Sequence, residues 1–205
     1  PAAIIYPKLA PPHLSAWHFQ QQAYLWLLNT LKSTEFNQVW QQTGLLWLLA
    51  GNQQREAEKL NNHPWPRSLV HKVNAQQATQ LAGLTVDTEC LYFPQAGYLQ
   101  PRALADIWLN HPNIHCIYNT SIVDLTKQGQ EWLAFDAQHN IIAQAPVVII
   151  ANALAAQKLS VSQDLPLTAV RGQIGQFEST KTLSSLKSVL CYGGYLTPAY
   201  NNKHC

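Results

Sequence analysis

The sequence predicts a protein of the α/β (α+β) class, and three features carry this prediction. Helical spacing of apolar residues alternates with short apolar runs along most of the chain. Three half-apolar segments at 121–125, 132–136 and 141–144, separated by turn residues, predict an antiparallel β-meander. Residues 147–150 are consecutive β-branched residues, a pattern typical of a parallel strand that helices cover on both faces.

The first third of the chain predicts a long helix and two strands. Apolar residues at helical spacing place that helix after Pro12: Leu14, Trp17, Tyr24, Leu28 and Leu31. Apolar runs predict strands at 45–49 and 69–73. Between them, a polar stretch predicts an exposed helix at 52–61, and the prolines within 63–66 predict a loop.

Start and stop residues define two further helices. Asn74 is a good N-cap for a helix at 75–81, which Gly83 ends. Pro101 fits the first turn of a helix at 101–110. We expect a loop at 94–101, a helical turn at 184–188, and the remaining strands at 90–93, 114–118, 167–177, 189–192 and 195–197.

Composition limits the class of protein. Of the 205 residues, 47% are hydrophobic and 12% charged, the latter about half the usual share. The chain lacks Met and begins at Pro1, so we expect an interior part of a larger protein. The formal net charge is +2 without a Lys/Arg cluster, which by itself does not indicate nucleic-acid binding. No apolar run approaches the ~18 residues of a membrane helix, so no membrane association is predicted.

Cysteine usage predicts free thiols in a cytoplasmic protein, because the four cysteines are widely spaced and form no Cys-x-x-Cys. Two of them directly follow a histidine, at 115–116 and 204–205. Adjacent residues of a strand point to opposite faces, so no metal site is predicted at either pair.

Several strings agree, in order, with one known family. They are Tyr6-Pro7-Lys8-Leu9, Phe93-Pro94-Gln95-Ala96-Gly97-Tyr98-Leu99, Ala151-Asn152-Ala153, Val170-Arg171-Gly172-Gln173, Cys191-Tyr192-Gly193-Gly194-Tyr195-Leu196-Thr197-Pro198 and His204-Cys205. Over nearly its whole length the chain resembles the glycine oxidase and D-amino-acid oxidase (DAO) superfamily. Within that superfamily it resembles the oxidoreductase half of the MnmC family, bifunctional enzymes that modify the wobble uridine of tRNA.

The resemblance implies a function. In this family the oxidoreductase half carries FAD and removes the carboxymethyl group of 5-carboxymethylaminomethyl-(2-thio)uridine in tRNA, leaving 5-aminomethyl-uridine. A separate methyltransferase half then methylates the amine. The flavin accepts the hydride and the protein positions it, so no acid–base triad is required. The implied cofactor is FAD, the implied partner is tRNA, and neither a metal nor a membrane is implied.

The resemblance also implies cofactor-binding residues. Ala151, Asn152, Ala153 and Leu154 match the segment that passes close to FAD, where the family often has Gly at the position of Ala153. Ile122 matches a position beside the adenine end, although a core role in the meander fits its pattern equally well. The segment around Ile4 matches one that runs beside the isoalloxazine.

Three residues match the substrate side. Tyr98 lies in a motif in which the family has two glycines and an aromatic residue. Arg171 matches a strand that faces the flavin, where it would bind a carboxylate or form a structural ion pair. Tyr195 lies in a sheet on the substrate side. No residue is implied as catalytic.

The resemblance implies two interleaved domains. Residues 1–33 and 98–164 match an FAD-binding Rossmann-like domain with a three-stranded β-meander, and 34–97 and 165–205 match a mixed-sheet substrate domain of the D-amino-acid oxidase type. No Gly-x-Gly-x-x-Gly occurs in these 205 residues, so the turn that seats a pyrophosphate is absent from them. We therefore expect the chain alone to bind no FAD.

Two alternatives remain open. A glycine or D-amino-acid oxidase would act on a free small amine in a closed pocket, whereas a tRNA substrate would require a basic rim around the site. A non-catalytic module, in which a truncated fold serves only for interaction, would carry no flavin in the purified full-length protein.

Overall fold

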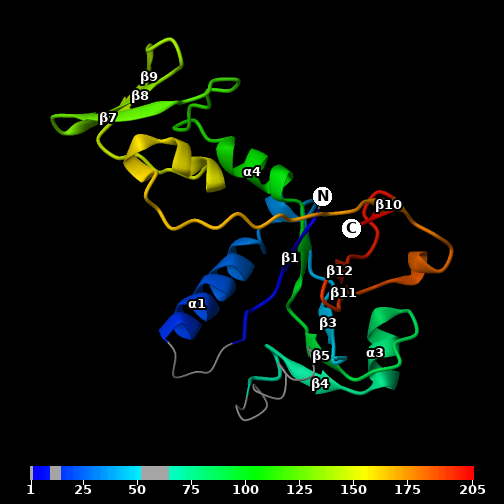
Figure 1. Cartoon of the computed structure of the whole chain (residues 1–205). Coiled ribbons are helices and arrows are strands. Elements are labelled where there is room, and N and C mark those ends of the chain that lie inside the picture. Colours follow the sequence, from blue (N-terminus) through cyan, green and yellow to red (C-terminus); the bar gives the residue numbers. More distant parts are fainter. Residues whose placement is uncertain (1, 10–14, 52–64) are drawn as a thin grey trace. The chain divides into compact units, whose positions relative to one another are not determined.

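The computed structural model describes residues 2–9, 15–51 and 65–205, and the predicted helix at 52–61 lies outside them. The chain forms two compact units, Pro1–His111 with Ile174–Cys205, and Pro112–Gln173. We refer to them as unit 1 and unit 2 (Figure 1). The α/β class is confirmed, because unit 1 combines helices with antiparallel and mixed sheets.

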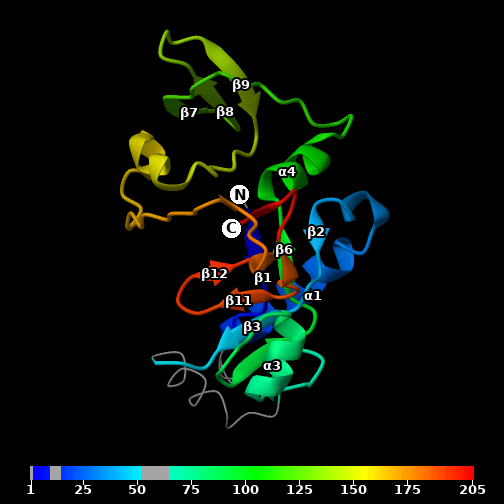
Figure 2. The same ribbon diagram turned by 90° about the vertical axis from the view of Figure 1, so that its right-hand side faces the viewer.

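Unit 1 contains two main sheets. The larger has five strands in the order β12-β11-β3-β5-β4, and β11 runs parallel to β3. Its strands are Tyr195–Leu196, Val189–Cys191, Leu45–Leu48, Cys90–Phe93 and His71–Val73. The smaller is antiparallel with the order β1-β6-β2, formed by Ala3–Ile5, Gly97–Leu99 and Trp40–Gln41 (Figure 2). A separate antiparallel pair joins β10, Phe177–Glu178, to β13, Lys203–His204.

Side-chain alternation along the strands builds three apolar layers in unit 1. On β3, Leu45 packs into a cluster between the two sheets, while Leu46 packs against the helix α3, Ala75–Ala82. On β1 and β6, Ile4 and Tyr98 contact the same middle cluster, whereas Leu99 faces the helix α1, Ser15–Thr30. The predicted strand at 45–49 is therefore confirmed as one buried on both faces.

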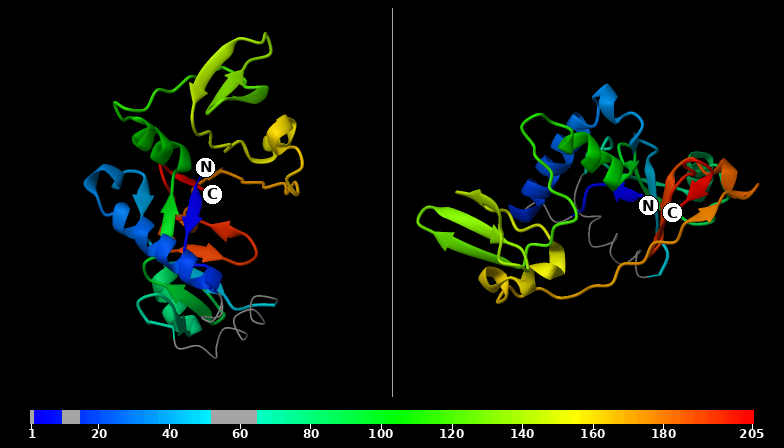
Figure 3. Two further views of the ribbon diagram at one scale, coloured as in Figure 1. Left: turned by 90° about the vertical axis from the view of Figure 1, so that its left-hand side faces the viewer. Right: turned by 90° about the horizontal axis from the view of Figure 1, so that it is seen from above.

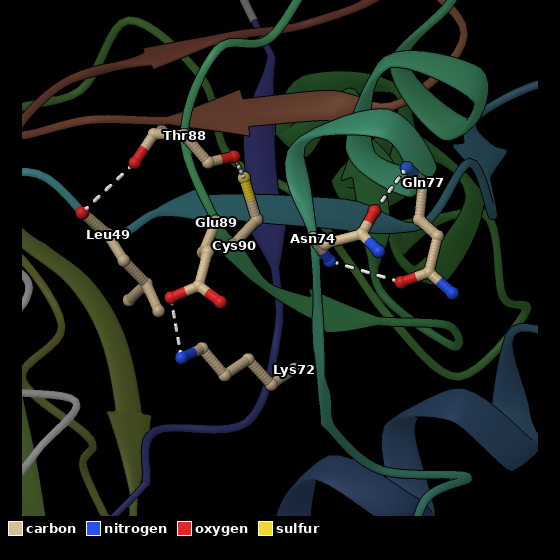
Figure 4. Close-up of polar contacts among 7 residues, drawn as sticks. All are labelled: Leu49, Lys72, Asn74, Gln77, Thr88, Glu89 and Cys90. Carbon is tan, nitrogen blue, oxygen red and sulfur yellow. Dashed lines mark hydrogen bonds and ion pairs between the residues drawn. The ribbon is translucent and has the colours of Figure 1, made fainter.

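The helices of unit 1 end where their sequences dictate. Asn74 and Gln77 form a reciprocal capping box at the start of α3, with the Asn74 side chain 2.9 Å from the Gln77 backbone nitrogen (Figure 4). Gly83 ends α3 in the left-handed conformation. Pro101 occupies the first turn of α4, Pro101–Leu109, which packs Leu104 into the α1 cluster. Short 3-10 turns at Thr34–Phe36 and Leu183–Ser185 complete the unit.

Unit 2 contains the predicted meander. Its strands β7, β8 and β9 are Asp124–Gln128, Glu131–Phe135 and Ile141–Ala145, each antiparallel to the next (Figure 3). Two 3-10 segments follow, η2 at Ala153–Lys158 and η3 at Ser160–Ser162. The Ser160 hydroxyl donates to the Asp124 carboxylate at 3.1 Å and so ties η3 to β7.

Three predicted strands are wrong. Residues 147–150 form no strand, and Val147 and Ile149 are 73% and 85% exposed. Residues 114–118 are irregular, and of 167–177 only Phe177 lies in a strand. An apolar run indicates a preference for burial, but a strand also needs a hydrogen-bonding neighbour, and no described residue pairs with 147–150. Conversely, the predicted loop at 94–101 contains strand β6.

Candidate functional site

A pocket of about 400 Å³ lies at one end of the middle apolar layer of unit 1. We call it the Tyr98 pocket. Both ends of the chain contribute to it, and they lie side by side in Figures 1 and 3. Its lining residues are Ala2, Tyr98, Gln100, Gln176, Thr197, Tyr200, Asn201, Lys203 and Cys205.

Backbone pairing fixes the C-terminal wall of the Tyr98 pocket. The Thr197 nitrogen donates to the Cys205 carbonyl at 2.9 Å, and the Cys205 nitrogen donates to the Thr197 hydroxyl at 3.2 Å. His204 is fully buried, and its Nδ1 lies 2.8 Å from the Thr197 carbonyl oxygen. Because a carbonyl oxygen only accepts hydrogen bonds, Nδ1 is the donor. The Nε2 atom of His204 lies 2.9 Å from the Ser179 hydroxyl. These hydrogen bonds join Thr197, His204 and Cys205 in one wall.

A two-residue turn sets the rim of the pocket. Asn201 and Asn202 both have positive φ, 48° and 61°, as a type I′ turn requires. Tyr200 and Lys203 pair across the turn through backbone hydrogen bonds of 2.8 and 3.0 Å. Residues paired across such a turn project to the same side, and both Tyr200 and Lys203 line the pocket.

The buried phenol groups near the pocket stay protonated at neutral pH. Burial raises the pKa of Tyr98, and neighbouring Tyr200 and Cys205 raise it further. Burial also raises the pKa of Tyr195, whose hydroxyl donates to the Ala2 carbonyl at 3.0 Å. Tyr195 thereby ties strand β12 to the segment that precedes β1. Tyr98 can act as a hydrogen-bond donor to a ligand.

A second, apolar hollow of about 510 Å³ lies in unit 2, and we call it the Ala151 hollow. Its described lining residues are Ile150, Ala151, Ala153, Leu154, Ala156, Leu165, Leu167 and Thr168, none of them charged. Such a surface suits a flat ring system of a cofactor such as FAD. The hollow offers no cation to the phosphates of FAD. These residues therefore fit the rings of FAD, and its pyrophosphate would be bound by residues elsewhere in a protein.

The structure brings together three of the predicted site residues in unit 1. Ile4 on β1 lies directly opposite Tyr98 on β6, and both pack into the middle cluster with Tyr195. Tyr98 is 4% exposed and lines the Tyr98 pocket, whereas Ile4 and Tyr195 are half-buried and lie outside its lining. The predicted substrate residues Tyr98 and Tyr195 therefore belong to one apolar layer.

The remaining predicted site residues lie in unit 2. Ala151, Ala153 and Leu154 line the Ala151 hollow, and exposed Asn152 between them does not. Half-buried Ile122 precedes β7 and is not a lining residue. Arg171 is exposed in an irregular segment and does not line the hollow either.

Six polar residues of the Tyr98 pocket were not predicted from the sequence: Gln100, Gln176, Thr197, Tyr200, Asn201 and Lys203. One signal was present. An Asn-Asn pair is a strong signal for a tight turn with positive φ, and the residues that flank such a turn share a side. That signal would have paired Tyr200 with Lys203 but not placed them against Tyr98.

No group of three potential metal ligands occurs among the described residues. No helix in the described part of the chain has the length and apolar character to cross a membrane. All four cysteines are free thiols, with Cys90 buried and the others half-buried.

Comparison with known proteins identifies the family. The model of the family "DAO: FAD dependent oxidoreductase" matches residues 1–205. The MnmC proteins (tRNA 5-methylaminomethyl-2-thiouridine biosynthesis bifunctional protein) of Methylobacillus flagellatus and Stutzerimonas stutzeri are 31% and 29% identical over 100% of this chain. The chain spans only 32% and 31% of the length of these two relatives.

Solved structures show the same fold. A thermally stable mutant of fructosyl peptide oxidase superposes with a TM-score of 0.73 at 13% identity, over 100% of this chain and 52% of that one. Glycine oxidase from Geobacillus kaustophilus gives 0.69 at 13% identity, over 98% of this chain and 58% of that one. The chain belongs to the DAO family of FAD-dependent oxidoreductases.

Proposed function

We propose that the protein carrying this chain uses FAD to oxidise the carboxymethylamino group of 5-carboxymethylaminomethyl-(2-thio)uridine at the tRNA wobble position. This proposal rests on the similarity to MnmC proteins, which extends over the whole chain. The two MnmC proteins named above are 29% and 31% identical to it. The chemistry that FAD supplies when bound is acceptance of a hydride from the carbon between amine and carboxylate. Water then releases glyoxylate and leaves 5-aminomethyl-uridine.

We assign the predicted residues to roles within this proposal. Residues 1–33 and 98–164 would belong to the FAD domain, and 34–97 and 165–205 to the substrate domain. Apolar contacts from Ala151, Ala153 and Leu154 would hold the rings of FAD, with Asn152, Ile122 and Ile4 at its edges. Tyr98, Arg171 and Tyr195 would face the amine substrate. We place the protein in the cytoplasm, where tRNA is modified.

The direct test uses the purified full-length protein. Its visible absorbance should show bound oxidised flavin, and a non-catalytic module would show none. Under anaerobic conditions, tRNA that carries the carboxymethylaminomethyl group should bleach the flavin and release one glyoxylate for each flavin reduced. The matched control is the same tRNA carrying 5-aminomethyl-uridine, which should cause no bleaching.

A second candidate is an oxidase of free small amines, and the small volume of the Tyr98 pocket favours it, since about 400 Å³ accommodates a free amino acid. Free glycine in the same anaerobic assay separates the two. Bleaching by glycine at least as fast as by the modified tRNA would contradict the tRNA proposal.

A further inference from the structure

The helix α1 has an apolar outer face. Trp17 and Tyr24, seven positions apart, are buried and face the core of unit 1. Phe19 and Trp26 are also seven positions apart, and the helical period places them on the opposite side of α1. Phe19 is 77% exposed and Trp26 is 66% exposed. We call Phe19, Trp26 and the exposed residues 22–23 between them the α1 stripe.

The composition of α1 differs from that of the helices α3 and α4. None of its 16 residues is Asp, Glu, Lys or Arg. The helix α3 is also uncharged, but its exposed side chains include the glutamines Gln76, Gln77 and Gln80. The exposed side of α4 carries Arg102 and Asp106. Depletion of charge together with exposed aromatic residues is typical of the core of a protein–protein interface, so the α1 stripe has the composition of a contact surface.

The chemistry of the α1 stripe limits what can cover it. Nucleic acids and anionic membrane surfaces are bound through Lys and Arg, which α1 lacks. A stable interface with a second copy needs about 800 Å² from each partner. A large aromatic side chain buries about 150–250 Å² in total, so two partly exposed ones supply about half of that area or less. A segment of the same polypeptide needs less area, because a tethered segment loses less translational and rotational freedom when it docks.

The relatives of the chain are long enough to supply such a segment. The MnmC proteins of Stutzerimonas stutzeri and Methylobacillus flagellatus match 100% of this chain, which spans only 31% and 32% of their length. A parent protein of that size carries about two thirds of its residues outside these 205.

We propose that a part of the parent polypeptide outside residues 1–205 packs on the α1 stripe, with Phe19 and Trp26 as the buried anchors of the contact. Aromatic anchors of this kind supply most of the energy of an interface. The inference goes beyond the proposed reaction and does not depend on it.

Hydroxyl-radical footprinting of the full-length protein measures the coverage of each side chain. The oxidation rate of a residue in the native protein is compared with its rate in the urea-unfolded protein, and peptide mass spectrometry reads both. Trp17 is 4% exposed on the same helix and serves as the buried standard. We expect Trp26 and Phe19 to be protected about as strongly as Trp17. Oxidation of Trp26 at nearly its unfolded rate would overturn the proposal.

Dilution identifies what covers the α1 stripe. A segment of the same polypeptide protects Trp26 equally at every protein concentration, and sedimentation velocity follows the molecular mass in parallel. Protection that is lost on dilution together with a fall in mass would assign the α1 stripe to a second copy. Protection that requires added tRNA would assign it to RNA, and either result overturns the proposal. The measurement contains no amine substrate, so failure of the anaerobic tRNA assay would leave it unaffected.

Substitutions in the full-length protein give an independent test. Trp26→Glu places an unpaired carboxylate in the contact and should lower the melting temperature by several degrees. Trp26→Phe keeps an apolar anchor and should lower it much less. The matched control Gln76→Glu adds the same charge to the exposed side of α3 and should leave the melting temperature unchanged. Equally small shifts in Trp26→Glu and Gln76→Glu would overturn the proposal. If Trp26→Glu does not fold, the footprint of the wild type decides.

Discussion

Ala153 holds a backbone conformation that residues with a side chain rarely adopt, with φ of 51°. This conformation costs an L-residue about 1–2 kcal/mol, and glycine adopts it without that cost. We expect Ala153→Gly to raise the free energy of unfolding by roughly 0.5–1 kcal/mol after the greater flexibility of glycine in the unfolded chain is counted. Urea denaturation measures the change.

The control for this substitution is Ala151→Gly, which lies two residues earlier and has no positive φ. At that position glycine relieves no strain and only makes the unfolded chain more flexible. The free energy of unfolding should therefore fall by about 0.5–1 kcal/mol. Equal effects of the two substitutions would show that Ala153 is not strained.

Burial raises the pKa of the Cys90 thiol from 9.0 to about 11. The folded-state pKa therefore lies above the unfolded one, and the stabilisation by the neutral thiol is complete below pH 9 and is lost as the pH rises through about 11. Between these values the free energy of unfolding should fall by up to about 1.4 kcal/mol per pH unit from this group. The free energy of unfolding should fall less steeply with pH in Cys90→Ala. An identical dependence on pH would contradict a raised pKa at Cys90.

At the scale of single elements, Gly97 lets two strands approach closely. A Cβ atom there would collide with the Gln41 carbonyl oxygen on β2. Gly97→Ala should therefore push β6 away from β2 and cost about 1–3 kcal/mol in thermal or urea unfolding. Gly175→Ala, where an added Cβ meets nothing within 4 Å, should change stability by less than about 0.5 kcal/mol. Similar losses in both variants would contradict the close approach.

Local chemistry predicted the best-defined elements correctly. The cap at Asn74 and the stop at Gly83 are properties of a few neighbouring residues, and α3 has almost the predicted bounds. The meander was also predictable, because its strands pair with their sequence neighbours. Strand β6 was missed because its pairing with β1 joins residues about 94 positions apart, Ile4 and Tyr98 being directly opposite.

At the scale of the whole molecule, two similar apolar runs form different structures. Leu45–Leu48 is flanked by β5 and β11, strands that come from distant parts of the sequence. Residues 147–150 pair with no described strand. Periodicity reports which residues prefer burial and not which segment covers them, so the sequence could not separate these cases. For the same reason it identified Tyr98 but not the Lys203 that shares its pocket.

The exposure of 147–150 predicts how the 205-residue chain behaves on its own. Ile149 is 85% exposed beside Val147, in a segment with unpaired backbone groups, which is a template for pairing with a second copy. We therefore expect concentration-dependent self-association in sedimentation velocity. Ile149→Lys should shift the chain toward monomer without lowering its melting temperature, because no buried site receives the charge. Val161→Lys, at an exposed residue of η3, should leave association unchanged. A large drop in the melting temperature of Ile149→Lys would instead mean that this residue is buried in the isolated chain.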